Sequence, residues 1–252
     1  MIWQNLTSKQ LDDTDRRTPV LLPMASIEQH GPHLPVATDR LICEHFCREI
    51  DQAVPKKVLI LPTVSVGCSA HHMEFAGTLT VSHEAFADYA MGILTSVHKH
   101  GFTNLVLFNS HGGNSAIAKV IVERFGRDHG GCRIVLATWW QIAAARLGPL
   151  CQAGPEGTGH AGEFETSIML YIEETLVDTD AVDAYPKNPT FDWAEDNLLE
   201  GARAPLYRTF RQMTSSGVFG NCQYASADKG KQITDIVLAE AAKIIEDLSA
   251  SP

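Results

Sequence analysis

The sequence lacks several features that would place it in a specialised class of protein. Its six cysteines include no C-x-x-C pair, and there is no internal repeat. No apolar run approaches the roughly 18 residues that a membrane-spanning helix needs. The first residues are polar and acidic, without the apolar core of a secretory signal. We therefore expect a cytoplasmic protein with buried thiols rather than disulfides or thiolate metal ligands.

Positive charge is also scarce. The 252 residues contain 20 Lys and Arg against 30 Asp and Glu, which gives a net charge of −10. A nucleic-acid-binding face would need excess positive charge to meet the phosphates, and an anionic membrane surface would repel this chain. We therefore expect a small-molecule substrate, with no nucleic-acid or membrane partner. The length and the 44% hydrophobic content suit a single globular domain over 1–252.

Short apolar runs alternate with longer amphipathic stretches. The runs are rich in Val, Ile and Leu with little alternation, which is typical of strands buried on both faces of a parallel sheet. They cover 19–24, 57–64, 104–110 and 133–140. Helices are expected at 39–50, 82–98, 114–125, 162–174 and 225–248. This order predicts an α/β protein with a mostly parallel sheet and helices on both faces. The Pro- and Gly-containing segment 178–223 is expected to cover an active site or contact another subunit.

Histidines and carboxylates follow each of the predicted strands. In parallel α/β sheets, ligands bind outside the carboxyl ends of the strands, so side chains at these positions share one site. The residues concerned are Glu28, His30, His33, Asp39, His71, His72, His111, His160, Glu163 and Glu165. Glu28 and His30 lie two positions apart in an extended segment and therefore point the same way.

Imidazole and carboxylate ligands without cysteine favour Zn²⁺, Mn²⁺ or Fe²⁺. We predict five ligands, and three of them are carboxylates, which is more than one tetrahedral ion requires. The set therefore indicates two divalent ions that share a carboxylate and activate a bridging hydroxide. The predicted ligands are Glu28, His30, Asp39, His111 and Glu163.

The segment 160–167 holds two acids and a histidine whose roles must differ. On a helix Glu163 and Glu165 diverge by roughly 200°, so they do not bind the same ion. We favour Glu163 as the ligand and give Glu165 a supporting role. His160 precedes the helix and is predicted to move a proton as the catalytic acid or base.

The glycine turn at 109–114, NSHGGN, allows a different interpretation. Such a turn before a helix could cradle a phosphate, which would make the protein a non-catalytic nucleotide-binding domain with structural histidines. It has neither the P-loop lysine nor the G-x-G-x-x-G spacing. We favour a role in which Gly112 and Gly113 let the backbone pass close to metal and substrate.

Four motifs together resemble the creatininase (creatinine amidohydrolase) family. They are EQHGPHLPVATD at 28–39, SAHHMEFAGT at 69–78, NSHGGN at 109–114 and HAGEFETS at 160–167. The resemblance implies a three-layer α/β/α fold, hydrolysis of C–N bonds, and a homo-oligomer, commonly a hexamer. It implies that Glu28, Asp39 and His111 hold one ion. His30, Asp39 and a second Glu would hold the other, with Asp39 bridging.

The chain departs from creatininase itself in two places. Creatininase has HYEN where this chain has His111-Gly112-Gly113-Asn114, so a metal-binding Glu is missing and Glu163 is its natural replacement. Trp140 resembles the first of two substrate-stacking tryptophans, but the second falls near Glu156. We expect His72, Trp140, Gly112 and Gly113 to contact the substrate, and creatinine to be a poor one. Other branches of the family suggest formamide, peptide or keto-inositol substrates.

Overall fold

The computed structural model describes residues 1–250, apart from the side chains at positions 155 and 156. At its centre four parallel strands form one sheet in the order β2-β1-β3-β4. Every residue of β1 and β3 is buried, because helices cover both faces of the sheet. The strands are β1 (Val20–Met24), β2 (Leu59–Ile60), β3 (Asn104–Asn109) and β4 (Arg133–Thr138).

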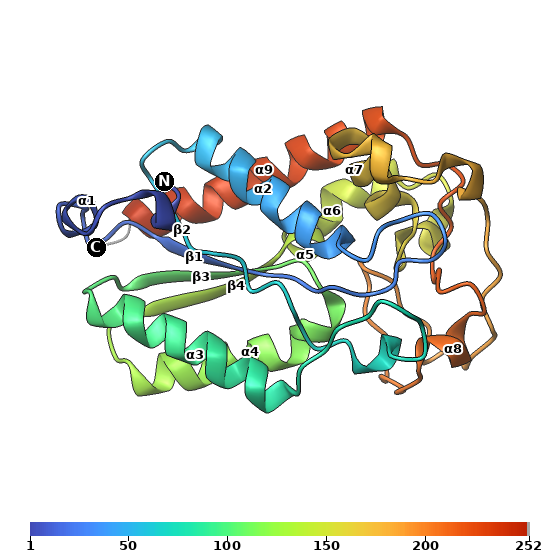
Figure 1. Ribbon diagram of the computed structural model, residues 1–252, viewed down its shortest axis with the longest axis horizontal. Coiled ribbons are helices and arrows are strands. Elements are labelled where there is room, and N and C mark those ends of the chain that lie inside the picture. The colour runs from blue at the N-terminus through green and yellow to red at the C-terminus, as the bar shows by residue number, and fades with distance from the viewer. Residues whose placement is uncertain (251–252) are drawn as a thin grey trace.

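The helices form a layer on each face of the sheet, so the three-layer α/β/α prediction is confirmed (Figure 1). One face is covered by α3 (His83–Lys99) and α4 (Ser115–Asp128). The other is covered by α2 (Thr38–Ala53), α7 (Glu163–Ile172) and α9 (Ala227–Ala250). Five predicted helices are thus present. The shorter helices are α1 (Ser8–Asp12), α5 (Trp139–Ile142), α6 (Ala144–Leu147) and α8 (Phe210–Met213).

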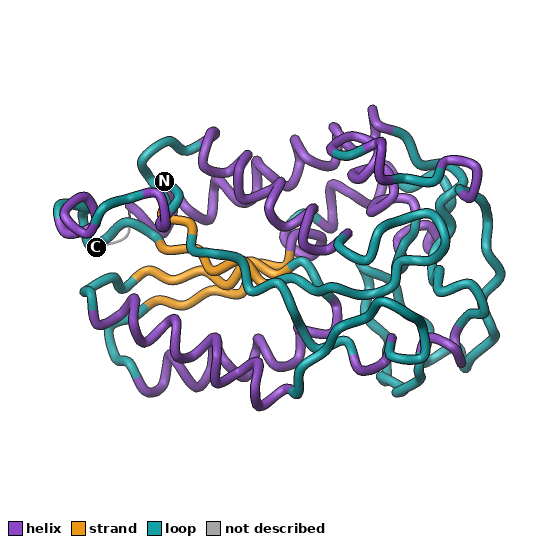
Figure 2. The backbone as a smooth tube through the Cα atoms, viewed as in Figure 1, coloured by secondary structure: helices purple, strands orange, loops and turns teal. Residues whose placement is uncertain are grey.

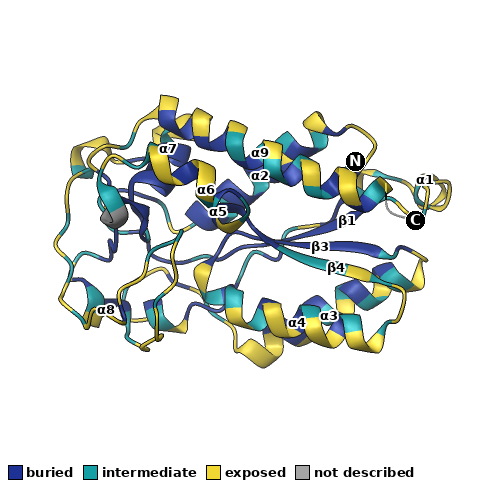
Figure 3. Ribbon diagram, turned by 180° about the vertical axis from the view of Figure 1, so that it is seen from behind, coloured by how far each residue is buried: buried dark blue, intermediate teal, exposed yellow. Residues whose placement is uncertain are grey.

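Each face of the sheet carries its own hydrophobic core (Figure 3). Successive side chains of a strand point to opposite faces, so Leu21 enters one core and Leu22 the other. Phe46 and Trp139 fill the core beneath α2, α7 and α9, whereas Phe86 belongs to the core beneath α3 and α4. The cores hold the layers rigidly, which leaves the loops beyond the strands to build a site.

Two predicted strands extend less far than the apolar runs suggest. The run 57–64 pairs as β2 only over Leu59–Ile60, and Val64 adds one isolated bridge to Met24. The hydrogen bonds to β1 come from the N–H groups of Leu59, Leu61 and Val64, so their spacing changes from two residues to three after Leu61 and the regular pairing ends there. The run 133–140 ends as a strand at Thr138, because Trp139 begins α5. Because both strands end early, the residues that follow them form loops and short helices at the carboxyl edge of the sheet.

Loops gather beyond the carboxyl ends of the strands, at the end of the molecule opposite the two termini (Figure 2). The predicted excursion 178–223 lies here and contains only isolated bridges, a one-turn 3₁₀ helix and the short helix α8. Within residues 1–250, no helix is both long enough and apolar enough to cross a membrane.

The contact between α7 and α9 depends on a small residue. A Cβ added at Gly230 of α9 would lie 2.0 Å from the carbonyl oxygen of Ser167 in α7. We expect Gly230→Ala to lower the free energy of unfolding by about 1–3 kcal/mol, because the helices must separate. Gly92→Ala is the control: this site on α3 is exposed and a Cβ there meets no atom within 4 Å. It should raise stability by up to about 1 kcal/mol. Urea denaturation measures both, and equal stability of the two variants would contradict the prediction.

Candidate metal centre

A cavity of about 500 Å³ opens at the carboxyl ends of the strands. Its floor is made by histidines and carboxylates, and its walls include Trp140 and Phe210. The excursion 178–223 supplies one side of it through Asn197, Leu198 and Tyr207. The segment therefore covers the site, as one of the two predicted roles requires. Predicted site residues that line the cavity are Glu28, Asp39, His72, His111, Gly112, Gly113, Trp140 and His160.

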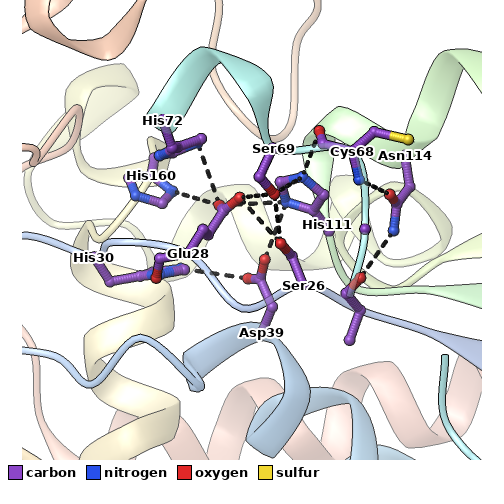
Figure 4. Close-up of polar contacts among 12 residues, drawn as sticks. Ser26, Glu28, His30, Asp39, Cys68, Ser69, His72, His111, Asn114 and His160 are labelled. Atoms are coloured by element: carbon purple, nitrogen blue, oxygen red, sulfur yellow. Dashed lines mark hydrogen bonds and ion pairs between the residues drawn. The ribbon is translucent and has the colours of Figure 1, made fainter. Parts of the chain in front are cut away.

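Separate loops bring the floor residues together (Figure 4). Glu28 and His30 follow β1, and Asp39 lies in the first turn of α2. His111 follows β3 by two residues. His160 precedes α7. Because parallel strands all end at the same edge, these residues become neighbours although they lie far apart in the sequence.

Asp39 lies between two histidines and faces each with a different oxygen. Its Oδ2 is 3.0 Å from Nδ1 of His111, and its Oδ1 is 3.3 Å from Nε2 of His30. Glu28 approaches the first histidine, with Oε1 3.3 Å from the same nitrogen of His111. Glu165 approaches the second, with Oε2 3.8 Å from Nε2 of His30. The cluster therefore divides into two halves that meet at Asp39.

The carboxylates of this cluster are buried without a lysine or arginine. Glu28, Asp39 and Glu165 are 1%, 2% and 4% exposed. In the described part of the chain, they form ion pairs with histidines alone. Burying carboxylates is costly unless nearby positive charge offsets the lost hydration. The site must therefore acquire positive charge from protons or from metal cations.

The pKa values reflect this deficit of positive charge. Burial by itself lowers the pKa of His30, but the contact with Asp39 and the charges of Asp39, Glu165 and Glu28 together outweigh it and raise the pKa to about 9. Burial raises the pKa of Glu165 to about 7, although the neighbouring His30 opposes that change. A divalent cation can take the place of these protons, because metal ligands bind in their deprotonated forms.

Two imidazoles are oriented to offer a lone pair to the cluster. Nδ1 of His30 is 3.1 Å from the carbonyl oxygen of Glu28, so this nitrogen donates and Nε2 is left facing the acids. Nε2 of His111 is 3.2 Å from the carbonyl oxygen of Cys68, which leaves Nδ1. Nε2 of His30 and Oδ2 of Asp39 are buried without a hydrogen-bond partner. Such anchored histidines and orphaned atoms fit a metal site.

Among the described residues, three groups bring ligand atoms within 4.8 Å of one another. Glu28, Asp39 and His111 form the first, which matches the ligand set expected for one ion. The second contains His30 and Glu165 together with His160. The third consists of Glu28, His72 and His160.

The structure does not bring Glu163 to this cluster and places Glu165 there instead. The Glu163 carboxylate accepts the backbone N–H groups of Gln152 and Ala153 at 2.9–3.1 Å and pairs with Lys229. Burial would raise the pKa of Glu163, but the hydrogen bonds from Gln152 and Lys229 lower it. Glu163 therefore ties the start of α7 to α9, while Glu165 faces His30.

The remaining predicted residues lie around the cluster. Nε2 of His72 is 3.3 Å from Oε1 of Glu28, so this histidine contacts a candidate ligand as well as the cavity. A Cβ at Gly113 would lie 2.1 Å from the Cys68 carbonyl oxygen, which explains the need for glycine there. Trp140 is 3% exposed. Position 156, the expected place of a second aromatic residue, lies outside the described side chains.

Several contributors carry no recognisable signal in the sequence. Ser69 donates a hydrogen bond from Oγ to Oε2 of Glu28 at 2.6 Å. The ring of Phe210 stacks on His72 with centroids 3.8 Å apart and meets His160 at 4.6 Å. Phe210 comes from the excursion, where no periodic pattern identifies individual residues. Serines and a single phenylalanine are too common to be selected by residue type.

The fold and the cluster define the class: a metal-binding α/β protein with its site at the carboxyl edge of a parallel sheet. The chain belongs to the creatininase family, because the family model described as creatinine amidohydrolase matches residues 4–245.

Individual relatives support this assignment. A mycofactocin precursor peptide peptidase from Mycobacterium ulcerans is 30% identical, over 90% of this chain and 83% of its own. A 3-dehydro-scyllo-inosose hydrolase from Thermotoga maritima is 24% identical, over 98% and 83%. A solved creatininase variant of Zn–Zn type has the same fold, with a TM-score of 0.81 at 22% identity over 99% and 98% of the two chains. The protein is a hydrolase of the creatininase-like amidohydrolase class.

Matched variants test whether Glu165, and not Glu163, binds an ion. Glu165→Gln should lower the occupancy of one ion, because it removes the charge that faces His30. Glu163→Gln should keep both ions but lower the free energy of unfolding by roughly 3–5 kcal/mol, since Lys229 is left buried without its partner. Elemental analysis and urea denaturation of the two folded variants decide this. Loss of an ion from folded Glu163→Gln would return Glu163 to the ligand set.

Proposed function

We propose that this protein hydrolyses a C–N bond of the cyclic amide or formamide type in a small molecule, using two divalent ions. The observation that carries the proposal is the position of Asp39, whose two oxygens face His111 at 3.0 Å and His30 at 3.3 Å. A carboxylate placed in this way can serve two ions at once. The cavity of about 500 Å³ above it suits a small substrate.

Five side chains would hold the ions. Glu28, Asp39 and His111 would bind one, and His30, Asp39 and Glu165 the other. The oxygen and nitrogen donors suit Zn²⁺, Mn²⁺ or Fe²⁺. Two such ions supply Lewis acidity, which activates water and stabilises the developing oxyanion. The solved creatininase variant described as Zn–Zn type supports a pair of ions in this fold.

His160 is the proposed catalytic residue for the leaving nitrogen. It lines the cavity, and its Nε2 donates to the carbonyl oxygen of Gln29 at 2.8 Å. The Nδ1 atom therefore carries the lone pair, 3.6 Å from Oε1 of Glu28. An imidazole held in this way can accept a proton at Nδ1 and return it to the nitrogen that leaves.

The substrate would lie between Trp140 and the glycine turn. Trp140 provides an apolar wall, and Gly112 and Gly113 line the cavity beside His111. Hydrolysis of a keto-inositol ring remains the second candidate, favoured by the inosose hydrolase relative that matches 98% of this chain. The earlier nucleotide-binding alternative is set aside because the family is one of hydrolases.

We also propose that the chain forms a homo-oligomer, a hexamer by resemblance. The excursion carries aromatic side chains that a monomer would leave in water. Phe191 and Trp193 stack with centroids 4.9 Å apart, and they are 60% and 39% exposed. Burying such rings against another copy would be favourable.

The direct test of the function is a substrate screen with protein reconstituted with Zn²⁺ or Mn²⁺. We expect turnover of at least one cyclic amide or formamide, weak turnover of creatinine, and two ions per chain. Asp39→Asn is the control and should lose both ions and the turnover, because it removes the shared charge. Two tightly bound ions in Asp39→Asn would contradict the bridging role. A wild-type protein with two ions that cleaves no C–N substrate, but opens inosose rings, would favour the second candidate.

The role of His160 is tested separately from metal binding. His160→Ala should retain both ions and lose about 10²–10⁴ in kcat, the usual effect of removing a general acid or base. Metal analysis is done beside kinetics on the best substrate of the screen. If His160→Ala loses an ion instead, His160 is a ligand and the proton is moved by another group.

A further inference from the structure

Gln29 lies in the sequence between the candidate ligands Glu28 and His30, and its side chain contacts His72 and His160. Its amide is uncharged, so we do not count it among the metal ligands. Gln29 is 5% exposed. Backbone groups determine which way its amide faces. Oε1 accepts the N–H of Gly31 at 3.0 Å, and Nε2 donates to the carbonyl oxygen of Gly217 at 3.0 Å. Reversing the amide would oppose two donors at Gly31 and two acceptors at Gly217.

The partner at position 217 has to be glycine for this arrangement. Gly217 has a φ of +89°, and a Cβ there would lie 2.0 Å from Oε1 of Gln29. The excursion 178–223 therefore contacts Gln29 through the backbone of Gly217, with no side chain between them. This contact links the cover of the site to the segment that carries Glu28 and His30.

The oriented amide determines where His72 carries its proton. Nε2 of Gln29 is 2.9 Å from Nδ1 of His72. An amide nitrogen offers only hydrogens, so Nδ1 must accept and the proton of a neutral His72 is on Nε2. That N–H faces Oε1 of Glu28 at 3.3 Å. His72 therefore presents a proton, and not a lone pair, to Glu28.

The backbone of the same residue determines the tautomer of His160. The carbonyl oxygen of Gln29 is 2.8 Å from Nε2 of His160 and can only accept, so that nitrogen carries the proton. The two amide hydrogens of Gln29 go to Gly217 and His72. The 3.2 Å approach of its Nε2 to Nε2 of His160 is thus a contact without a hydrogen bond.

We propose that Gln29 is a positioning residue that sets the tautomers of both histidines around Glu28. His72 thereby presents a proton to Glu28 instead of a lone pair to a metal, and the Nδ1 lone pair of His160 is left free, 3.6 Å from Oε1 of Glu28. Of the three candidate groups, Glu28, His72 and His160 then do not form a third metal site. This inference rests on the proposed metal centre but not on the bond that the enzyme cleaves.

The N–H of His72 beside Glu28 has a measurable consequence for metal binding. It orients the Glu28 carboxylate, and groups that orient a ligand in this way typically contribute 10–100-fold to metal affinity. Phe210 stacks on the outer face of His72 and restrains the ring. A change of tautomer would place two lone pairs, from Nε2 and Oε1, against each other.

A double-mutant cycle with Zn²⁺ as the probe tests the proposal. Gln29→Met keeps the volume of the side chain but removes the amide, and should weaken Zn²⁺ binding by about 10–100-fold in chelator competition. His72→Gln places an amide N–H near the position of Nε2 and has no tautomer to choose. In that background Gln29→Met should cost less than about threefold, because the coupling is lost. Gln232→Met, on the exposed face of α9, is the matched control.

The protonation of His72 is observed directly by ¹⁵N NMR of histidine-labelled protein loaded with Zn²⁺. In the wild type Nδ1 should resonate as an unprotonated nitrogen and Nε2 as a protonated one. Gln29→Glu presents an acceptor instead of a donor and should reverse the two. Equal loss of Zn²⁺ affinity in both backgrounds, or a protonated Nδ1 in the wild type, would overturn the proposal. Failure of the substrate screen with the coupling intact would instead refute only the proposed function.

Discussion

The structure of the site depends on three carboxylates that are buried where no lysine or arginine of the described chain pairs with them. The ion pairs of Glu28, Asp39 and Glu165 are formed with histidines only, so the positive charge that these acids require comes from protons or from a metal cation. This requirement explains why His30 and His111 are each anchored to a backbone carbonyl through one ring nitrogen and present the other nitrogen to the acids. It also explains why buried atoms of His30 and Asp39 lack hydrogen-bond partners.

In this fold the packed layers provide rigidity, and the loops at one edge of the sheet carry the polar side chains of the site. Two hydrophobic cores hold the parallel sheet between its helices, and the loops at one edge carry the polar residues. The excursion 178–223 then closes one side of the cavity, with Phe210 stacked on His72 and Gly217 bonded to Gln29. The cover and the ligands are therefore parts of one network, in which the cover restrains the groups that orient Glu28.

The two acids in the first turn of α7 have different surroundings, although they are the same residue type. Glu163 and Glu165 lie in the same turn but point away from each other, so only one can face the cluster. Glu163 is satisfied by Lys229 and two backbone N–H groups, and holds α7 against α9. The other acid is left with a raised pKa beside His30. The ion pair with Lys229 thus holds Glu163 away from the cluster, whereas Glu165 faces it.

Local patterns in the sequence were sufficient for the layers, the parallel strands and the grouping of Glu28, His30, Asp39 and His111. These features follow from apolar runs, helical spacing and the rule that parallel strands end at one edge. The different surroundings of Glu163 and Glu165 needed the tertiary structure, because Lys229 lies 66 residues away and no local pattern pairs it with Glu163. The roles of Gln29 and Phe210 were also decided only in three dimensions, since a hydrogen-bond network depends on distances between segments that the order of residues does not contain.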